Sequence, residues 1–199
     1  MTGASRDSFR WRPSPNLTPW KIWPCLLARG LERRFFLELA QGIWIDQNLN
    51  TLVLCPTGSG KSFFSCVLRL AACRTNQSVR YFITSRLLFQ LVQSRLDGSF
   101  LTLLASLAKI DLLVLDDWMR DPITTSETRD LLEILDDRFG HISTLVASQV
   151  PMAEWFTRFP DPTHADPILN PIIQIAYRLN LTGDSQRKCV PPSLCHPLD

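Results

Sequence analysis

The sequence predicts an α/β domain with a mostly parallel central sheet. Three observations support this fold class: short apolar runs alternate with helical stretches, one apolar run leads into a glycine-containing loop, and another ends in two adjacent carboxylates. Such alternation is typical of strands that are joined by crossover helices. The expected strands are TLVLC (51–55), VRYFI (79–83), DLLVLDD (111–117) and STLVAS (143–148).

Helical patterns fill the intervals around these strands. The first, RGLERRFFLELAQG (29–42), alternates charged and apolar residues and should form one amphipathic helix that Gly42 stops. In the last, TSETRDLLEILDDRFG (125–140), Thr124 and Glu127 predict a capping box and Gly140 predicts the end of the helix. The remaining helices are expected at 61–74, 85–96 and 99–110.

Length and composition favour one domain. The 199 residues are 45% hydrophobic, which is enough for a single core, and the net charge of +2 does not by itself indicate a nucleic-acid partner. Six cysteines without a C-x-x-C pair indicate neither a disulfide framework nor a zinc module. No apolar run reaches the about 20 residues that cross a bilayer, and no complete signal peptide is present, so we expect a cytoplasmic protein without a membrane partner.

The chain is expected to have three parts. Residues 1–27 are rich in Pro, Ser, Arg and Trp and lack periodicity, which predicts an irregular, poorly ordered leader. The domain proper is expected at 28–188. Residues 189–199 contain several prolines and predict a flexible tail.

The stretch LVLCPTGSGKSFF (52–64) matches the phosphate-binding pattern G-x-x-x-x-G-K-[ST], or Walker A motif, at every position but the first glycine. A strand, a glycine loop and a helix follow one another here, which is the context the motif requires. Lys61 should reach the β- and γ-phosphates of a nucleotide, and the Ser62 hydroxyl should ligate Mg²⁺. The predicted nucleotide-binding residues are Cys55, Pro56, Thr57, Gly58, Ser59, Gly60, Lys61, Ser62 and Phe63.

Cys55 occupies the position of that first glycine. Because this position lies where the strand ends, a side chain is tolerated if its φ stays negative, whereas a Cβ at Gly60 would lie near the phosphates. We therefore expect Cys55 to weaken nucleotide binding without abolishing it.

A second motif, LLVLDDW (112–118), is a hydrophobic strand that ends in two carboxylates, as a Walker B motif does. Asp116 should hold Mg²⁺ through water, and Asp117 should act as a general base or orient the attacking water. This strand is expected beside the strand that carries the phosphate-binding loop. Ser148 and Gln149 end the fourth strand and could contact the γ-phosphate or its attacking water, or could simply begin the loop before Pro151.

Together these residues resemble a known family. The segments that carry the resemblance are 29–62, DLLVLDDW (111–118), RDLLEILDDRFG (129–140), STLVASQVP (143–151), DPTHAD (161–166) and TGDSQRK (182–188). Over residues 28–188 the chain resembles the IstB-like helper ATPases of bacterial insertion sequences, relatives of the helicase loader DnaC in the AAA+ class. The resemblance implies a three-layer α/β/α P-loop NTPase fold, ATP and Mg²⁺ as cofactors, and DNA, a transposase of the same element and further copies of the chain as partners.

The resemblance also implies roles for individual residues. Lys61, Asp117 and Ser148 match catalytic positions of the family, and Ser62 and Asp116 match its Mg²⁺-binding positions. The family's DPT-x-AD element continues as AILDRL, whose arginine is expected to reach the ATP of a neighbouring subunit. Here Asn170 and Pro171 replace its aspartate and arginine, and Pro167 and Pro171 conflict with an uninterrupted helix.

Three functional hypotheses remain open. The first is an ATP-dependent, DNA-binding helper of transposition. The second is a degenerate remnant that binds nucleotide weakly or not at all and lacks efficient hydrolysis, which Cys55, Asn170, Pro171 and the atypical leader favour. A small-molecule P-loop kinase is disfavoured because no substrate-binding lid with clustered basic residues follows residue 120.

Overall fold

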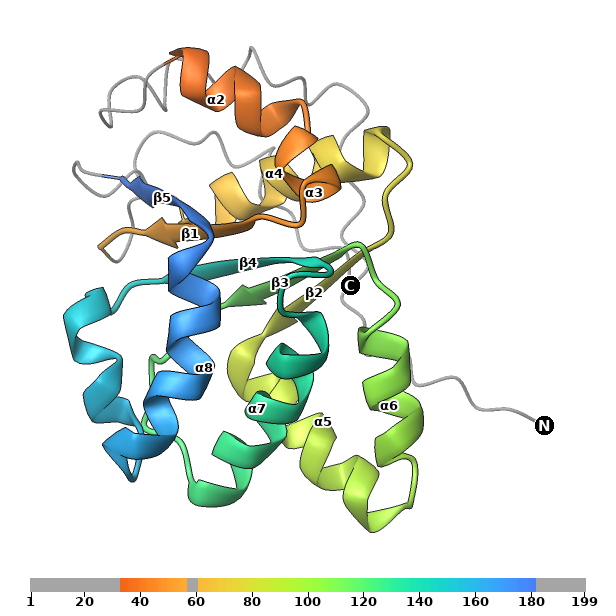
Figure 1. Ribbon diagram of the computed structural model, residues 1–199, viewed down its shortest axis with the longest axis vertical. Coiled ribbons are helices and arrows are strands. Elements are labelled where there is room, and N and C mark those ends of the chain that lie inside the picture. Colours follow the sequence, from red (N-terminus) through yellow and green to blue (C-terminus); the bar gives the residue numbers. More distant parts are fainter. Residues whose placement is uncertain (1–32, 57–60, 182–199) are drawn as a thin grey trace, which may run out of the picture.

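The computed structural model describes residues 33–56 and 61–181, and within them a parallel sheet lies between two layers of helices (Figure 1). The strands are β1 (Asn50–Leu54), β2 (Val79–Ile83), β3 (Leu112–Asp116), β4 (Ser143–Ser148) and β5 (Ala176–Asn180). Their order across the sheet is β2-β3-β4-β1-β5, and every neighbouring pair is parallel. The predicted fold class, a three-layer α/β/α domain with a mostly parallel sheet, is confirmed.

The helices divide between the two faces of the sheet (Figure 1). One face carries α2 (Arg33–Ala40), α3 (Ile43–Asp46) and α4 (Lys61–Arg74). The other carries α5 (Thr84–Leu96), α6 (Phe100–Leu107), α7 (Thr125–Arg138) and α8 (Pro162–Gln174). Two short 3-10 turns, η1 (Met152–Glu154) and η2 (Phe156–Arg158), precede α8. No helix in the described ranges is long and apolar enough to cross a membrane.

Each face of the sheet has its own hydrophobic core. Side chains alternate along a strand, so Val53, Leu112 and Val114 pack toward α2, α3 and α4. Leu52 and Leu113 pack toward α5 to α8. Because both faces are covered, β3 is apolar from Leu112 to Leu115, as the sequence indicated.

Several predicted elements are confirmed within a residue or two. The strands at 79–83 and 143–148 and the helix at 61–74 have the predicted bounds. The capping box forms as expected, with the Thr124 hydroxyl accepting from the Glu127 N–H and the Glu127 carboxylate accepting from the Thr124 N–H. Gly42 has a φ of 76° after α2, which ends that helix. The helix predicted at 99–110 is shorter and ends at Leu107.

One prediction about the sheet is wrong. The strand that ends in Asp116 does not lie beside the strand that leads into the phosphate-binding loop, because β4 pairs with both and separates them. Strand order depends on the path of the crossover connections, and the spacing of motifs along the chain does not determine it.

The C-terminal part of the domain also differs from expectation. Pro167 and Pro171 lie inside α8, which continues through both. Asp161 caps the helix, and Pro162 occupies its first turn, where a proline is tolerated. The helix packs on the core through the buried side chains Ala165, Ile168, Leu169 and Ile172. This packing compensates for the two backbone hydrogen bonds that Pro167 and Pro171 cannot donate, because proline has no N–H.

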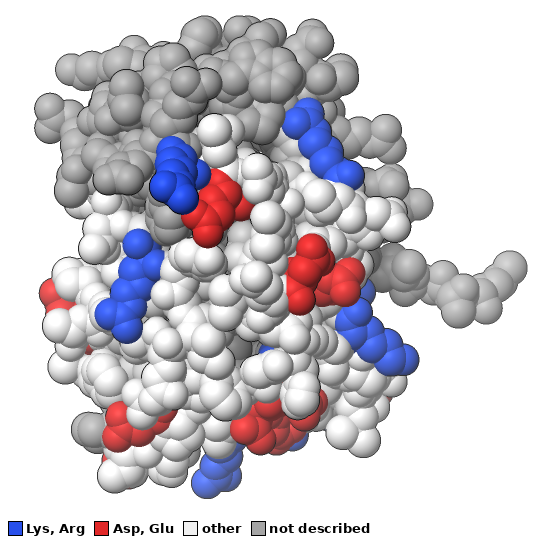
Figure 2. Space-filling view, turned by 45° about the horizontal axis from the view of Figure 1, so that its top comes forward, with Lys and Arg blue, Asp and Glu red and all other residues white. Residues whose placement is uncertain are grey.

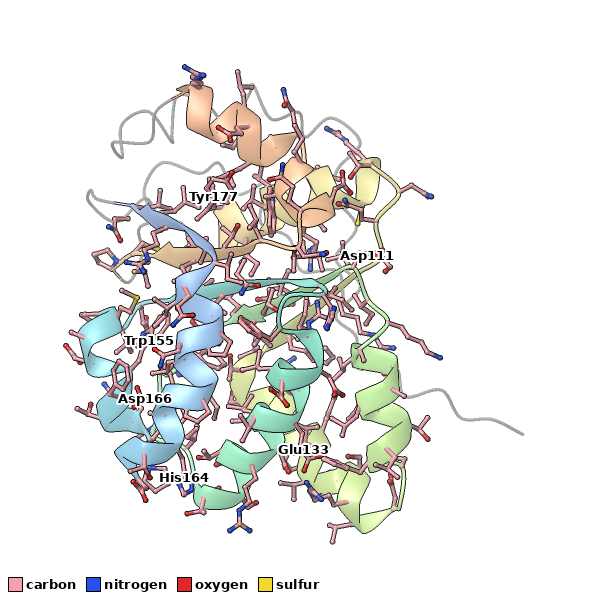
Figure 3. All side chains as sticks on the ribbon, viewed as in Figure 1. Asp111, Glu133, Trp155, His164, Asp166 and Tyr177 are labelled. Atoms are coloured by element: carbon pink, nitrogen blue, oxygen red, sulfur yellow. The ribbon has the colours of Figure 1, made fainter. Side chains whose placement is uncertain are left out.

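Strand β5 was not identified from the sequence, and it forms one edge of the sheet. Tyr177 on β5 extends toward α2 (Figure 3), where its hydroxyl donates to Glu38 Oε1 at 3.3 Å. Burial and the nearby Glu38 carboxylate raise the pKa of Tyr177. The parts predicted at 1–27 and 189–199 lie outside the described residues.

Candidate functional site

The candidate site lies at the edge of the sheet where β1, β3 and β4 end, next to the start of α4. Four residues that were predicted to surround the phosphates lie outside the described residues: Thr57, Gly58, Ser59 and Gly60. Ser62 and Phe63 belong to the first turn of α4, but their side chains are not described either. Their predicted contacts with nucleotide and Mg²⁺ therefore stay predictions.

Lys61 links the two motifs of the site. It is the first residue of α4, and only 8% of it is exposed. Its Nζ donates to Asp117 Oδ1 and lies 3.4 Å from Asp116 Oδ1. The structure thus brings together three of the predicted site residues although β3 and β1 are not neighbours.

Asp116 is almost fully buried, with 2% of its surface exposed, and its carboxylate is held on both oxygens. Oδ1 accepts from the Asp117 N–H at 2.9 Å, and Oδ2 accepts from the Tyr81 hydroxyl at 2.8 Å. The Thr84 hydroxyl donates to the main-chain carbonyl of Asp116 at 2.9 Å. Tyr81 and Thr84 were not predicted from the sequence, because their contacts depend on the pairing of Ile83 with Asp116 between β2 and β3.

Asp117 lies in a strained turn. Its φ is +54° and that of Met119 is +52°, a region that non-glycine residues adopt at a cost. The turn is held by a hydrogen bond from the Trp118 N–H to the Ala147 carbonyl. Arg120, which the sequence analysis also missed, places its Nη1 3.2 Å from Asp117 Oδ2. Asp117 is therefore fixed between two cations, Lys61 and Arg120.

Ser148 ends β4 between the two motif strands and is fully buried. Its Oγ lies 2.7 Å from the Trp118 carbonyl and accepts from the Val150 N–H at 3.1 Å. In this structure the hydroxyl thus connects the end of β4 to the turn that carries Asp117. Gln149, the alternative in the sequence analysis, is half-buried next to it.

Cys55 fits at the end of β1. It is 5% exposed and belongs to the core on the α4 side, with Phe64 and Val53. Its N–H donates to the Ser148 carbonyl at 3.1 Å, as a continuation of the strand would. It is not among the described residues with positive φ, so it meets the condition under which a side chain is tolerated there. The next residue, Pro56, is exposed.

The chemistry of the donors fits Mg²⁺. The cation prefers hard oxygen ligands and is commonly held by one or two carboxylates together with water and substrate phosphates. Each oxygen of Asp116 accepts one hydrogen bond and retains lone-pair capacity for a metal-bound water. The described ranges contain no group of three or more His, Cys, Asp or Glu side chains that could hold a metal alone. A Mg²⁺ ion at Asp116 would therefore need the phosphates of a nucleotide as ligands.

Solved structures with the same fold include a helicase loader and a replication initiator. The DnaC helicase loader superposes with a TM-score of 0.62 at 14% identity, over 75% of this chain and 89% of that one. The replication initiator DnaA, solved with AMPPCP and single-stranded DNA, superposes with a TM-score of 0.63 at 13% identity, over 86% and 51%. At these identities the likeness shows the fold alone.

Similarity in sequence identifies the family. Residues 25–190 match the IstB-like ATP binding proteins. A protein of Sinorhizobium fredii named as an insertion sequence ATP-binding protein is 41% identical over 160 residues, which cover 80% of this chain and 65% of the relative. One of Pseudomonas fluorescens is 46% identical over 124 residues, covering 62% and 54%. The chain thus spans less than two thirds of the length of these curated relatives. The chain belongs to the IstB-like ATP-binding protein family.

Proposed function

We propose that the chain is a helper ATPase of transposition, which binds ATP·Mg²⁺, hydrolyses ATP, associates with DNA and assists a transposase of the same insertion element. The observation that carries this proposal is the position of Lys61, buried against Asp116 and Asp117 where β1, β3 and β4 end. A phosphate-binding lysine and two acidic groups within reach of one another are what phosphoryl transfer requires.

Each residue has a distinct role in this proposal. Lys61 leaves its two carboxylate partners for the β- and γ-phosphate oxygens, which carry a higher density of negative charge. Asp117, released from Lys61, orients the attacking water and accepts its proton. Asp116 and the Ser62 hydroxyl would hold Mg²⁺, which neutralises charge on the phosphates when it is bound. Ser148 holds the Asp117 turn in place through the Trp118 carbonyl.

DNA, a transposase and further copies of the chain are proposed as partners. The names of the relatives, which refer to insertion sequences, support the link to transposition. On the face that Figure 2 shows, Lys and Arg side chains are scattered among uncharged and acidic residues and do not form one continuous patch. We expect DNA association to depend on nucleotide and on assembly, and to be measurable at low salt, where phosphate contacts are strongest.

The second candidate is a remnant without efficient hydrolysis. Pro171 stands where the family carries an arginine, and its carbonyl accepts from Asn50 Nδ2 at the start of β1. Position 171 therefore lies at the start of β1, the opposite end of this strand from the residues that lead to Lys61. Loss of that arginine favours a chain that binds ATP and turns it over slowly.

Steady-state ATP hydrolysis with and without DNA distinguishes these candidates. For the helper ATPase we expect a measurable rate that DNA stimulates and that Asp117→Asn abolishes, while Asp137→Asn, at an exposed position of α7, retains it. A folded wild-type chain without hydrolysis in either condition would favour the remnant. The absence of nucleotide-dependent DNA association at low salt would contradict the proposed partner.

A further inference from the structure

The carboxylate of Asp116 receives a hydrogen bond that the sequence motifs do not account for. Tyr81 on β2 donates its phenolic hydroxyl to Asp116 Oδ2 at 2.8 Å, while the other oxygen accepts from the Asp117 N–H at 2.9 Å. A carboxylate held on both oxygens from two directions cannot rotate freely about its Cβ–Cγ bond. Its orientation toward the phosphate-binding edge is therefore set by Tyr81 together with its own chain.

The sheet places Tyr81 for this contact. Strands β2 and β3 are parallel, with Tyr81 opposite Val114 and Ile83 opposite Asp116. Residues two apart on a strand share a face, so Tyr81 and Asp116 both lie on the face that α4 covers. Arg69 on α4 has its guanidinium carbon 5.0 Å from the centre of the Tyr81 ring. The phenol ring is thus held between β3 and the helix that begins at Lys61.

The chemical nature of the donor matters. A phenol is neutral at physiological pH, so its hydrogen bond fixes the carboxylate without cancelling its negative charge. Lys61, 3.4 Å from the other oxygen, is a cation that the proposed function assigns to the phosphates. When Lys61 moves to a nucleotide, Tyr81 and the Asp117 N–H remain as the donors that hold Asp116.

We propose that Tyr81 is a positioning residue that orients Asp116 toward the Mg²⁺ of a bound nucleotide. This inference rests on the proposed function, because it requires ATP·Mg²⁺ at the same site. Partners that orient a metal-binding group commonly change metal affinity by tenfold to a hundredfold when they are removed. Since Asp116 is expected to act through a water, we expect a change near the lower end, about tenfold.

The test is the Mg²⁺ dependence of nucleotide binding in the Tyr81→Phe variant of the full chain. A fluorescent ATP analogue is titrated at a series of Mg²⁺ concentrations and in EDTA. Tyr81→Phe keeps the ring over which Arg69 lies and removes only the hydroxyl. Tyr177→Phe is the matched control, because it removes the hydroxyl of the second of the chain's two tyrosines, which bonds Glu38 on α2 and not Asp116.

We expect Tyr81→Phe to raise the Mg²⁺ concentration at half-maximal binding about tenfold, with binding in EDTA unchanged. Tyr177→Phe should match the wild type. An unchanged Mg²⁺ midpoint in Tyr81→Phe, or an equal shift in Tyr177→Phe, would overturn this inference alone. A folded wild-type chain that binds no nucleotide at any Mg²⁺ concentration would overturn the proposed function and the inference with it.

Discussion

Arg138, at the end of α7, is a buried cation that connects three segments of the domain. It is 1% exposed. Its Nη1 donates to the carbonyls of Leu107 and Ile110 at 2.6 and 3.0 Å, and its Nη2 donates to the Ser143 carbonyl at 2.5 Å. Its Nε donates to the Thr144 hydroxyl at 3.2 Å. The guanidinium thus joins the end of α6 and the start of β4 to α7.

The Arg138→Met variant should lower the free energy of unfolding by about 3 kcal/mol. Each of the three carbonyls that loses its donor costs about 1–3 kcal/mol. Burial lowers the pKa of Arg138 to about 10, well below its ordinary value. At about 1.36 kcal/mol per pKa unit, keeping this cation buried costs about 3 kcal/mol. Methionine removes the cost of the buried charge, which stabilises the variant, but it also removes the hydrogen bonds to the three carbonyls. The loss of these hydrogen bonds changes the free energy of unfolding more.

Urea unfolding followed by tryptophan fluorescence measures this difference. Arg129→Met is the matched control, because Arg129 is exposed on the same helix, and it should stay within about 0.5 kcal/mol of the wild type. For a chain of this length, 3 kcal/mol corresponds to a melting temperature lower by roughly 6–12 °C. If Arg138→Met were as stable as Arg129→Met, the guanidinium would not hold these segments together and the reasoning would be refuted.

Two further predictions concern stability. The Ser78 hydroxyl and, secondarily, the Ser78 N–H hold the pKa of Asp111 below its ordinary value of 3.8. A carboxyl group with a lowered pKa stabilises the fold at pH values above 3.8, and this stabilisation is lost as the pH falls below 3.8. Asp111→Asn lacks this carboxyl group, so its free energy of unfolding should fall less on acidification than that of the wild type. Urea titrations at a series of pH values measure the difference. An unchanged pH profile would contradict this. Thr124→Ala should cost about 1 kcal/mol through loss of the capping box, whereas Thr125→Ala, at the next exposed position, should cost less than half of that. Equal costs would argue against the cap.

The sequence predicted those features that depend on neighbouring residues. The helix from Lys61 and the strand that ends in Asp116 follow from apolar periodicity and short motifs, and both were located to within a residue. The carboxylates and the start of α4 lie at the same ends of the parallel strands, as the rule that parallel strands end at one edge of the sheet requires, but the contact of Lys61 with the two carboxylates was not predicted.

What the sequence could not predict depends on pairing between distant segments. The position of β4 between β1 and β3 is set by crossover connections. The Tyr81 contact requires the register between β2 and β3, and the clamp of Arg120 on Asp117 requires a left-handed backbone that no local pattern indicates. The exposed Arg178 and Asn180 weaken the apolar signal of the edge strand β5.

We propose that Lys61 belongs to a nucleotide-binding site that Cys55 leaves functional. The most direct measurement is the titration of the purified chain with a fluorescent ATP analogue and Mg²⁺, alongside Lys61→Ala and the exposed control Lys109→Ala. We predict micromolar binding by the wild type and Lys109→Ala, and binding weaker by about tenfold to a hundredfold in Lys61→Ala, as expected for loss of a charge-assisted contact. No binding by a folded wild-type chain, or equal binding by Lys61→Ala, would show that Lys61 does not belong to a functional nucleotide-binding site.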